Sequence, residues 1–364
     1  MSRFKPQYRP LMLGFSLILM LGLVAYLYGW LCRALAGFHL APMLPALLSI
    51  AALLLLTVKP IPVKARSIFI IYLILFALLQ DAAALLLPLL HTPLLYALPP
   101  LLALAMLFYG LWCGRQVVLT RYRLRTAQPL PQGRLRIALL SDIHMGLAVD
   151  EAKLAATVQR INYEQPQLLL IAGDIVDDRT TAAEMQAACR ILGQVSAPLG
   201  RYAVYGNHDL ASHGPQLQFS RAELDAALAA AAITVLDDAV AELDGVTLLG
   251  RHDVFMSGYE RKTLAELQAE CRIPQPQILL DHQPLELHKA AGAGVMLMLS
   301  GHTHGGQLWP LGLLSSLLKV YELTYGHRQI GGTHFIVSSG LGMRGVKMRS
   351  GCRAEAVIID LYND

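Results

Sequence analysis

Residues 135–146 read "LRIALLSDIHMG", an apolar run of strand length that ends in an aspartate and a histidine two positions apart. Near-continuous apolar runs are typical of strands that are covered on both faces. Helical patterns at 150–164 and 180–193 separate the early runs of this kind. We therefore predict a mixed α/β sandwich over residues 135–364. Its other expected strands are "QLLLIAG", "RYAVYG", "VTLLG", "QILLD", "VMLMLS", "HFIVSS" and "AEAVIIDL".

The part of the chain before this sandwich has a different composition. The chain of 364 residues is 55% hydrophobic and only 15% charged, whereas ordinary soluble proteins are about 25% charged. Residues 1–130 hold 11 of the 30 Lys and Arg residues and a single acid, Asp81. The remaining 19 bases and 25 acids leave the second half with a net charge of −6. The basic character of the whole chain is therefore no sign of nucleic-acid binding, and we expect no nucleic-acid partner.

Four apolar stretches in residues 1–125 are long enough to cross a membrane as helices. A Pro- and Gly-containing linker at 126–134 follows them, and the polar residues Gln80 and Asp81 interrupt the third. An acid inside a span is either functional or a polar contact between helices. The four predicted spans cover residues 11–32, 40–58, 67–90 and 93–113.

Basic residues near the ends of these stretches predict their orientation. Three clusters fall on one side of the predicted bundle, and the two opposite connections carry only Arg33. Because basic residues favour the cytoplasmic side, we expect a multi-pass protein of the inner (cytoplasmic) membrane with both termini in the cytoplasm. The clusters are Arg3, Lys5 and Arg9; Lys59, Lys64 and Arg66; and Arg115, Arg121, Arg123 and Arg125.

Side chains that bind metals follow five of the predicted strands. The ends of strands are where ligands bind in open α/β sheets. In an extended segment, residues two apart point to the same side, so each D-x-H or H-x-H pair could present two ligands to one point. The residues are Asp142 and His144; Asp174; Asn207, His208 and Asp209; His282; and His302 and His304.

This mixture of side chains predicts two metal ions. A single ion rarely takes so many ligands, whereas two ions about 3.5–4 Å apart that share a carboxylate clamp the attacking and leaving oxygens of a phosphoryl group. Imidazole together with carboxylate and amide oxygen suits Mn, Fe, Zn or Co better than Ca or Mg. The five cysteines show no CxxC spacing, so we expect free thiols.

The blocks "D-x-H", "GD", "GNHD", a lone His and "GHTH", in this order, resemble the calcineurin-like metallophosphoesterase superfamily. The stretch "GHTHGGQ" (301–307) is similar to the branch that includes bacterial lipid-precursor (UDP-diacylglucosamine) phosphoesterases. The apolar spans resemble those of transmembrane metallophosphoesterases. The resemblance covers about residues 135–361 and implies a four-layer α/β/β/α sandwich behind a four-helix transmembrane domain.

The resemblance also implies a role for each motif residue. One metal would be held by Asp142, His144 and His304, the other by Asn207, His282 and His302, and Asp174 would bridge the two. His208 would stabilise charge on the phosphoryl group or protonate the leaving oxygen, and Asp209 would orient it. Outside this set, Asp281 is interpreted as a turn or supporting residue, and Asp177 and Asp178 as solvated loop acids.

Two cations attract an anionic phosphate, so the expected substrate is a phosphodiester, a pyrophosphate or a phosphomonoester. Arg344, Lys347 and Arg349 in the loop "GLGMRGVKMRSGCR" (340–353) either bind its phosphate or form a solvated basic loop. The apolar segment "LWPLGLLSSLLKVYELTYG" (308–326) is either a helix-turn packed on the sandwich or a membrane-facing flap for a lipid-linked substrate. The alternative function is a membrane sensor or transport protein whose soluble half only binds metal and nucleotide.

Overall fold

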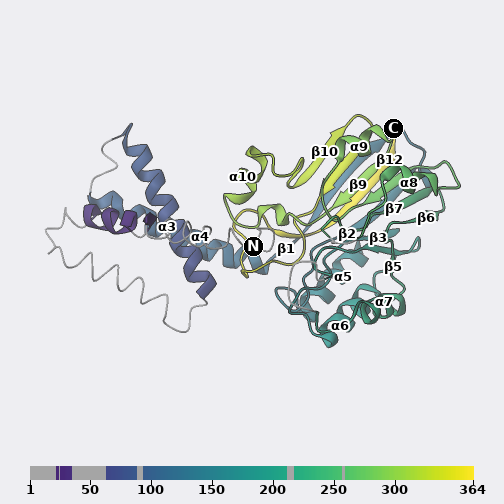
Figure 1. Cartoon of the computed structure of the whole chain (residues 1–364), viewed down its shortest axis with the longest axis horizontal. Helices are drawn as coiled ribbons and strands as arrows, with labels where there is room; N and C mark the ends of the chain where they lie inside the picture. Colours follow the sequence, from purple (N-terminus) through teal and green to yellow (C-terminus); the bar gives the residue numbers. More distant parts are fainter. Residues whose placement is uncertain (1–21, 24, 35–62, 88–92, 211–216, 256–258) are drawn as a thin grey trace. The chain divides into compact units, whose positions relative to one another are not determined.

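The computed structural model describes residues 22–23, 25–34, 63–87, 93–210, 217–255 and 259–364. The chain divides into two compact units, Met1–Gly110 and Leu111–Asp364. Figure 1 shows helices alone in the described part of the first unit, and two sheets with helices in the second. The candidate site lies in the second unit.

The first unit contains two segments that are apolar and long enough to cross a membrane. They are Ser67–Ala84, in α3 (Val63–Ala84), and Leu95–Arg115, which includes α4 (Leu98–Arg115) and continues into the second unit. They correspond to the third and fourth predicted spans. The predicted span 40–58 lies outside the described residues, and span 11–32 is described only at 22–23 and 25–32. The described residues therefore support two of the four spans.

Asp81 makes polar contacts inside the first unit. Its carboxylate accepts hydrogen bonds from the Tyr26 hydroxyl at 2.8 Å and from Arg33 Nη2 at 2.6 Å. The neighbouring Gln80 donates from Nε2 to the carbonyl of Leu95 at 3.3 Å. These bonds join separate helical segments, so the structure favours a contact between helices for Asp81.

Two six-stranded sheets form the second unit. The first has the order β1-β12-β2-β3-β4-β5 and the second β10-β11-β9-β8-β7-β6. The strands of the first sheet are β1 (Val117–Thr126), β2 (Arg134–Leu140), β3 (Leu168–Ala172), β4 (Arg201–Val204), β5 (Thr234–Val235) and β12 (Ala354–Asn363). Those of the second are β6 (Ala239–Leu243), β7 (Val246–Gly250), β8 (Gln277–Leu280), β9 (Leu297–Ser300), β10 (Gly326–Ile330) and β11 (Thr333–Val337).

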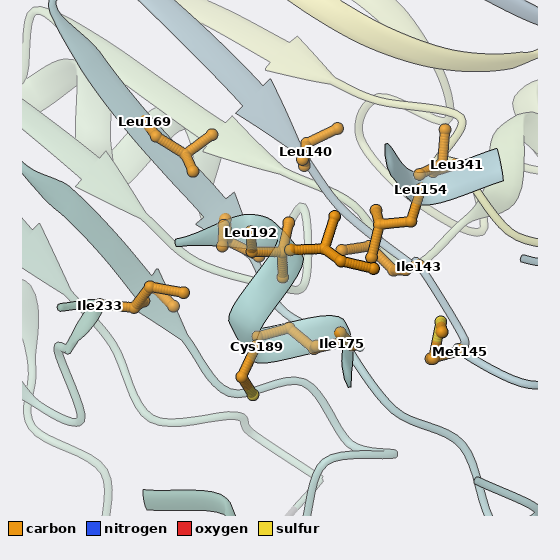
Figure 2. Packing of buried hydrophobic residues seen from close by; sticks show 14 of the residues in the cluster. Leu140, Ile143, Met145, Leu154, Leu169, Ile175, Cys189, Leu192, Ile233 and Leu341 are labelled. Carbon is orange, nitrogen blue, oxygen red and sulfur yellow. The ribbon is translucent and has the colours of Figure 1, made fainter. Parts of the chain in front are cut away.

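Three apolar clusters hold this unit together as four layers. One lies between the first sheet and the helices α5 (Glu151–Tyr163), α6 (Ala182–Leu192) and α7 (Arg221–Ala230); Figure 2 shows its interdigitated side chains, among them Leu140, Leu154 and Leu192. The second joins the two sheets. The third joins the second sheet to α8 (Leu264–Ala269) and α9 (Leu287–Gly292). The order helix, sheet, sheet, helix agrees with the predicted sandwich.

The parallel strands bring the functional residues to one place. In the first sheet β2, β3 and β4 are parallel neighbours, and in the second β8 pairs in parallel with β9. Every residue of β3 is buried, because helices cover one face of the sheet and the second sheet covers the other. The carboxyl ends of parallel neighbours lie at the same edge of a sheet. The residues that follow these five strands therefore meet.

The boundary between the units differs from the predicted one. Residues 117–126, which we placed in the transmembrane domain up to residue 125, form β1 and pair along their whole length with β12. The stretch "VVLTRYRLRT" alternates basic and other residues, which is the two-residue period of a half-exposed strand. The same arginines also fit the basic cluster expected at the end of a membrane span, so their pattern did not by itself identify a strand. The connection between β1 and β2 is correspondingly short and contains the 3₁₀ turn η4 (Pro131–Gly133).

Candidate metal centre

The loops that follow the five strands are tied to one another by hydrogen bonds. The amide of Asp142, after β2, donates to the carbonyl of Gly173, after β3, at 3.0 Å. The amide of His144 donates to the carbonyl of Asp174 at 3.1 Å. Across the two sheets, the amide of His302 donates to Asp142 Oδ1 at 3.0 Å. Hydrogen bonds therefore join the loops of both sheets at the site, and the Asp142 carboxylate accepts the one that crosses between the sheets.

Five of the predicted metal ligands have left-handed backbone angles. Such angles cost roughly 1–2 kcal/mol per non-glycine residue, and residues that keep them are concentrated at functional sites. They also correct our assumption of an extended backbone, on which residues two apart would always point to one place. The φ angles are 47° at Asp142, 47° at His144, 55° at Asp174, 67° at His302 and 51° at His304.

The ligand atoms form two groups, each within 4.8 Å of one another. The first consists of Asp142, His144 and His304, and the second of Asp174, His282 and His302. In the first group the Nε2 atoms of His144 and His304 lie 3.2 Å apart, and His304 Nε2 lies 3.6 Å from Asp142 Oδ1. The D-x-H pair thus serves one group, whereas the two histidines of "GHTH" belong to different groups.

Asp174 lies between the two groups. Its Oδ2 is 3.7 Å from His144 Nε2 in the first group and 3.2 Å from His282 Nε2 in the second. The side chain is almost completely buried, as are Asp142, His144 and His282. A buried carboxylate with imidazole nitrogens on two sides is suited to bridge two cations, because it can offer lone pairs to both.

Hydrogen bonding and charge prepare the histidines for metal binding. His282 Nδ1 lies 2.7 Å from the carbonyl of Ala172, so it carries the proton and leaves Nε2 toward Asp174. Burial alone would lower the pKa of His282, but the carboxylates of Asp174 and Asp142 outweigh it and hold that pKa well above its ordinary value. A cation would replace the proton there. Burial lowers the pKa of His302 to about 3 and that of His304 well below its ordinary value, so both rings are neutral.

The donor set fits two divalent transition-metal ions. Imidazoles and carboxylates converge in a buried space, where His282 Nε2 lies 3.2 Å from Asp174 Oδ2 and His304 Nε2 lies 3.6 Å from Asp142 Oδ1. The nitrogen-rich set favours ions of the Mn, Fe, Co and Zn kind over Ca²⁺ or Mg²⁺.

Comparison with known proteins agrees with this geometry. Residues 135–306 match the family model described as calcineurin-like phosphoesterase. A metallophosphoesterase of Aquifex aeolicus, itself uncharacterized, is 30% identical over 249 residues, which are 66% of this chain and 90% of that protein. The chain belongs to the calcineurin-like phosphoesterase family.

Other relatives in this family differ in how much of their length is matched. The uncharacterized metallophosphoesterase YkuE of Bacillus subtilis is 30% identical over 237 residues, or 62% of this chain and 78% of that protein. A Bos taurus protein named "transmembrane protein with metallophosphoesterase domain" is 33% identical over 239 residues, or 62% of this chain and 53% of that protein. The chain thus spans about half the length of the bovine relative.

His208, the histidine of the family's "GNHD" block, lies beside the two groups and not within them. Its amide donates to Asp174 Oδ1 at 2.8 Å. On the ring, Nδ1 lies 3.3 Å from Asp178 Oδ1, and Nε2 contacts Arg344 Nη1. Asp178, which we interpreted as a solvated loop acid, is therefore the carboxylate that contacts the His208 ring. The position of Arg344 beside His208 is compatible with phosphate binding.

Asp209 has a different task from the expected one. Its carboxylate is fully buried and accepts hydrogen bonds from the amides of Asp174 at 2.7 Å, Val176 at 3.0 Å and Gly206 at 2.9 Å. These bonds hold the loops after β3 and β4 together. Asp209 therefore fixes the backbone of the site, and orientation of the His208 ring falls to Asp178.

Two further supporting residues escaped the sequence reasoning. Asp177, which we interpreted as a solvated loop acid, is instead buried, and its Oδ2 lies 3.4 Å from His144 Nδ1. Gln283 is completely buried, and its Nε2 lies 3.3 Å from Asn207 Oδ1, 3.1 Å from His302 Nδ1 and 2.9 Å from Asp253 Oδ2. Gln283 thus connects Asn207 to the second group. The signal for both was adjacency to a motif: "GDIVDD" for Asp177 and "DHQP" for Gln283.

The basic residues of the 340–353 loop are not alike. Arg344 and Lys347 are exposed, whereas the Arg349 side chain is fully buried. Its guanidinium donates to the carbonyl of Ser339 at 2.7 Å and lies 3.4 Å from the carbonyl of His304. A side chain enclosed in this way cannot reach a substrate. Arg349 is therefore a structural residue, which corrects its predicted role in substrate binding.

Asp281 and the apolar segment 308–326 differ in how far they are buried. Asp281 is fully buried and forms ion pairs with Arg261 at 2.5 Å and Arg251 at 3.5 Å, so it supports its loop. In the segment 308–326, α10 (Leu311–Leu317) buries none of its residues. Further along the segment, Leu323 is buried in the third apolar cluster, so part of the segment packs on the sandwich while α10 itself stays exposed.

Proposed function

We propose that this protein is a metal-dependent hydrolase of a phosphoric ester or anhydride, with two divalent cations at the site. Asp142, His144 and His304 would hold one ion. Asn207, His282 and His302 would hold the other, with Asp174 between them. The position of the buried Asp174 carboxylate between two groups of imidazoles carries this proposal. Two bound cations activate water and neutralise charge on the transferring phosphoryl group.

The chain's own residues would bind and orient the phosphoryl group. His208 and Arg344 contact each other at the edge of the centre, so a phosphate oxygen there would meet an imidazole and a guanidinium together. We assign His208 to stabilise charge on this group or to protonate the leaving oxygen. Asp178 orients the His208 ring, and Asp209 keeps the loops of Asp174 and Gly206 in register.

The test is turnover by the purified full-length protein loaded with Mn²⁺, Co²⁺ or Zn²⁺. We expect hydrolysis of bis-p-nitrophenyl phosphate or p-nitrophenyl phosphate that depends on the metal. Asp174→Ala should lower kcat by about 10³-fold or more, because it removes the shared ligand. The matched control is Asp150→Ala, which removes an acid at the start of α5. Full activity of Asp174→Ala would contradict the assignment, and metal binding without turnover would favour the sensor or transport alternative.

We also propose that the protein is an inner-membrane protein with both termini in the cytoplasm. Two apolar helices of sufficient length and the basic residues at their ends support this topology. A cytoplasmic reporter such as green fluorescent protein fused after Asp364 should fluoresce. A fused alkaline phosphatase should be inactive, since it needs export. The opposite result would overturn the orientation.

A further inference from the structure

The helix α10 and the residues after it expose an unusually apolar surface. Leu317 is 68% exposed, Leu318 74% and Val320 58%. Each exposed leucine forgoes roughly 1.5–3 kcal/mol relative to a buried one. A contiguous apolar surface of this kind marks an interaction site. We call it the α10 surface; it consists of Leu311, Leu313, Leu314, Leu317, Leu318 and Val320.

Specific contacts hold α10 so that these leucines face outward. The amide of Trp309 donates to Ser350 Oγ at 3.1 Å, and Ser315 Oγ lies 3.1 Å from Thr324 Oγ1. The backbones of Gly306 and Gly312 approach so closely that a Cβ on Gly306 would lie 2.2 Å from Gly312 Cα. A seven-residue helix is not stable by itself. The surrounding contacts therefore position α10 directly beside the "GHTHGG" turn.

The loop 340–353 connects α10 to the end of an apolar helix. Gly114 lies in the last turn of α4, and a Cβ there would be 3.1 Å from Met343 Sδ and 3.1 Å from Met348 Cα. The apolar segment that contains α4 ends at Arg115. The same loop supplies Ser350 to Trp309. The loop 340–353 thus contacts both the C-terminal end of α4 and Trp309, which lies just before α10.

A pocket of about 300 Å³ is lined by residues of α10 and by Gly305 of the "GHTHGG" turn. Trp309, Leu313 and Tyr325 are the large apolar or aromatic residues of its lining. Gly305, the residue after the metal-group residue His304, is part of the wall. An apolar group that enters from the α10 surface would therefore lie next to the centre. Lys319, exposed at the end of the apolar patch, is suited to meet an anionic lipid head group.

We propose that the α10 surface docks onto the lipid bilayer that holds the apolar helices, and that the phosphorylated substrate is a lipid-linked one. The observation that favours a bilayer over another partner is the continuity between the end of α4, the 340–353 loop and α10. The apolar part of the substrate would use the pocket lined by α10. The proposal that the α10 surface docks on the bilayer does not depend on the enzymatic activity. The proposal of a lipid-linked substrate rests on the proposed hydrolase function.

Docking is tested without any enzyme assay. Leu314→p-benzoylphenylalanine is introduced into the full-length protein in membranes that contain radiolabelled phospholipid, and the sample is irradiated. We expect a lipid adduct at position 314 and none with the matched variant Tyr163→p-benzoylphenylalanine, since Tyr163 is 88% exposed at the end of α5. A crosslink from position 314 to protein, or no adduct there, would overturn the proposal.

The substrate half is tested by kinetics in vesicles of phosphatidylethanolamine and phosphatidylglycerol. The variant Leu314→Ser/Leu317→Ser/Leu318→Ser should lower kcat/KM for embedded hexadecyl p-nitrophenyl phosphate by about tenfold or more, a loss of about 1.4 kcal/mol. Hydrolysis of bis-p-nitrophenyl phosphate should stay within about twofold of wild type. The control is Tyr163→Ser/Ile273→Ser, which removes exposed apolar residues elsewhere.

The outcomes separate the two proposals. Equal losses on both substrates, or no loss on the embedded one, would overturn the lipid-linked substrate. Failure of the wild-type protein to hydrolyse either compound with any of the metals would count against the hydrolase function, and a lipid adduct at position 314 would still establish docking.

Discussion

The metal centre and α10 depart from the usual distribution of side chains in opposite ways. At the centre, the carboxylates of Asp142 and Asp174 are buried, whereas on α10 the side chains of Leu317 and Leu318 are exposed. A buried carboxylate is costly unless a cation or hydrogen bonds compensate it, and an exposed leucine forgoes the hydrophobic effect. Both arrangements become favourable with a partner from outside the chain. Both regions are therefore candidate binding sites, because their side chains contribute little to the stability of the folded chain alone.

Metal removal should have the largest effect, because it withdraws the partner of the buried carboxylates. Each ion present at about 100 times its Kd stabilises the folded state by about 2.7 kcal/mol. Treatment with a chelator should abolish hydrolysis and lower the melting temperature of the second unit, measured by differential scanning fluorimetry. Readdition of Mn²⁺ should restore both. An unchanged melting temperature would mean that the chain compensates these carboxylates by itself.

Arg349 is a buried charge that the chain itself compensates with hydrogen bonds. Its guanidinium donates to the carbonyls of Ser339 and His304. Arg349→Leu would leave these carbonyls without donors, so we expect a loss of about 3 kcal/mol or more in the free energy of unfolding. Thermal denaturation measures it, with the exposed Arg353→Leu as control. Wild-type stability of Arg349→Leu with loss of activity alone would restore a role in substrate binding.

A variant of Gln283 tests whether residues that contact the metal ligands also contribute to metal affinity. Gln283→Leu removes the amide that contacts Asn207, His302 and Asp253. Loss of such an outer contact typically lowers metal affinity about 10–100-fold. Metal titration followed by calorimetry should show this loss at one of the two sites, and the exposed Gln329→Leu should bind both ions normally. Unchanged affinity at both sites would make Gln283 a packing residue.

The smallest effect is expected for the folding stability of an α10 variant. Leu317→Ser changes a side chain that the described part of the protein leaves 68% exposed. The melting temperature of the detergent-solubilised protein should therefore correspond to a change of about 0.5 kcal/mol or less. Leu154→Ser, in the core beneath α5, provides the contrast, since this residue is fully buried. A large loss for Leu317→Ser would show that α10 packs within the fold.

Much of the fold could be predicted from the period of the apolar residues. All eight predicted runs contain strands, namely β2, β3, β4, β7, β8, β9, β11 and β12. The two predicted helical patterns contain α5 and α6, and a capping box of Thr181 and Glu184 begins α6. The strands β1, β5, β6 and β10 were not predicted, because they are short or half-exposed and their residues also suit loops. Their place depends on pairing with distant strands, as β1 does with β12.

By itself, the sequence determined which side chains lie at the strand ends, because alternation and length of apolar runs place each motif directly after a strand. The family resemblance already implied that His302 and His304 bind different metals, and the tertiary structure decided which contacts support this division. Left-handed backbone angles send His302 and His304 to different groups, and contacts between distant loops assign Asp178 to His208 and Gln283 to Asn207. The tertiary structure likewise buries Arg349 and leaves Arg344 exposed, although both lie in one basic loop. Neighbouring residues in a loop carry the same local signal, and burial depends on segments that are remote in the chain.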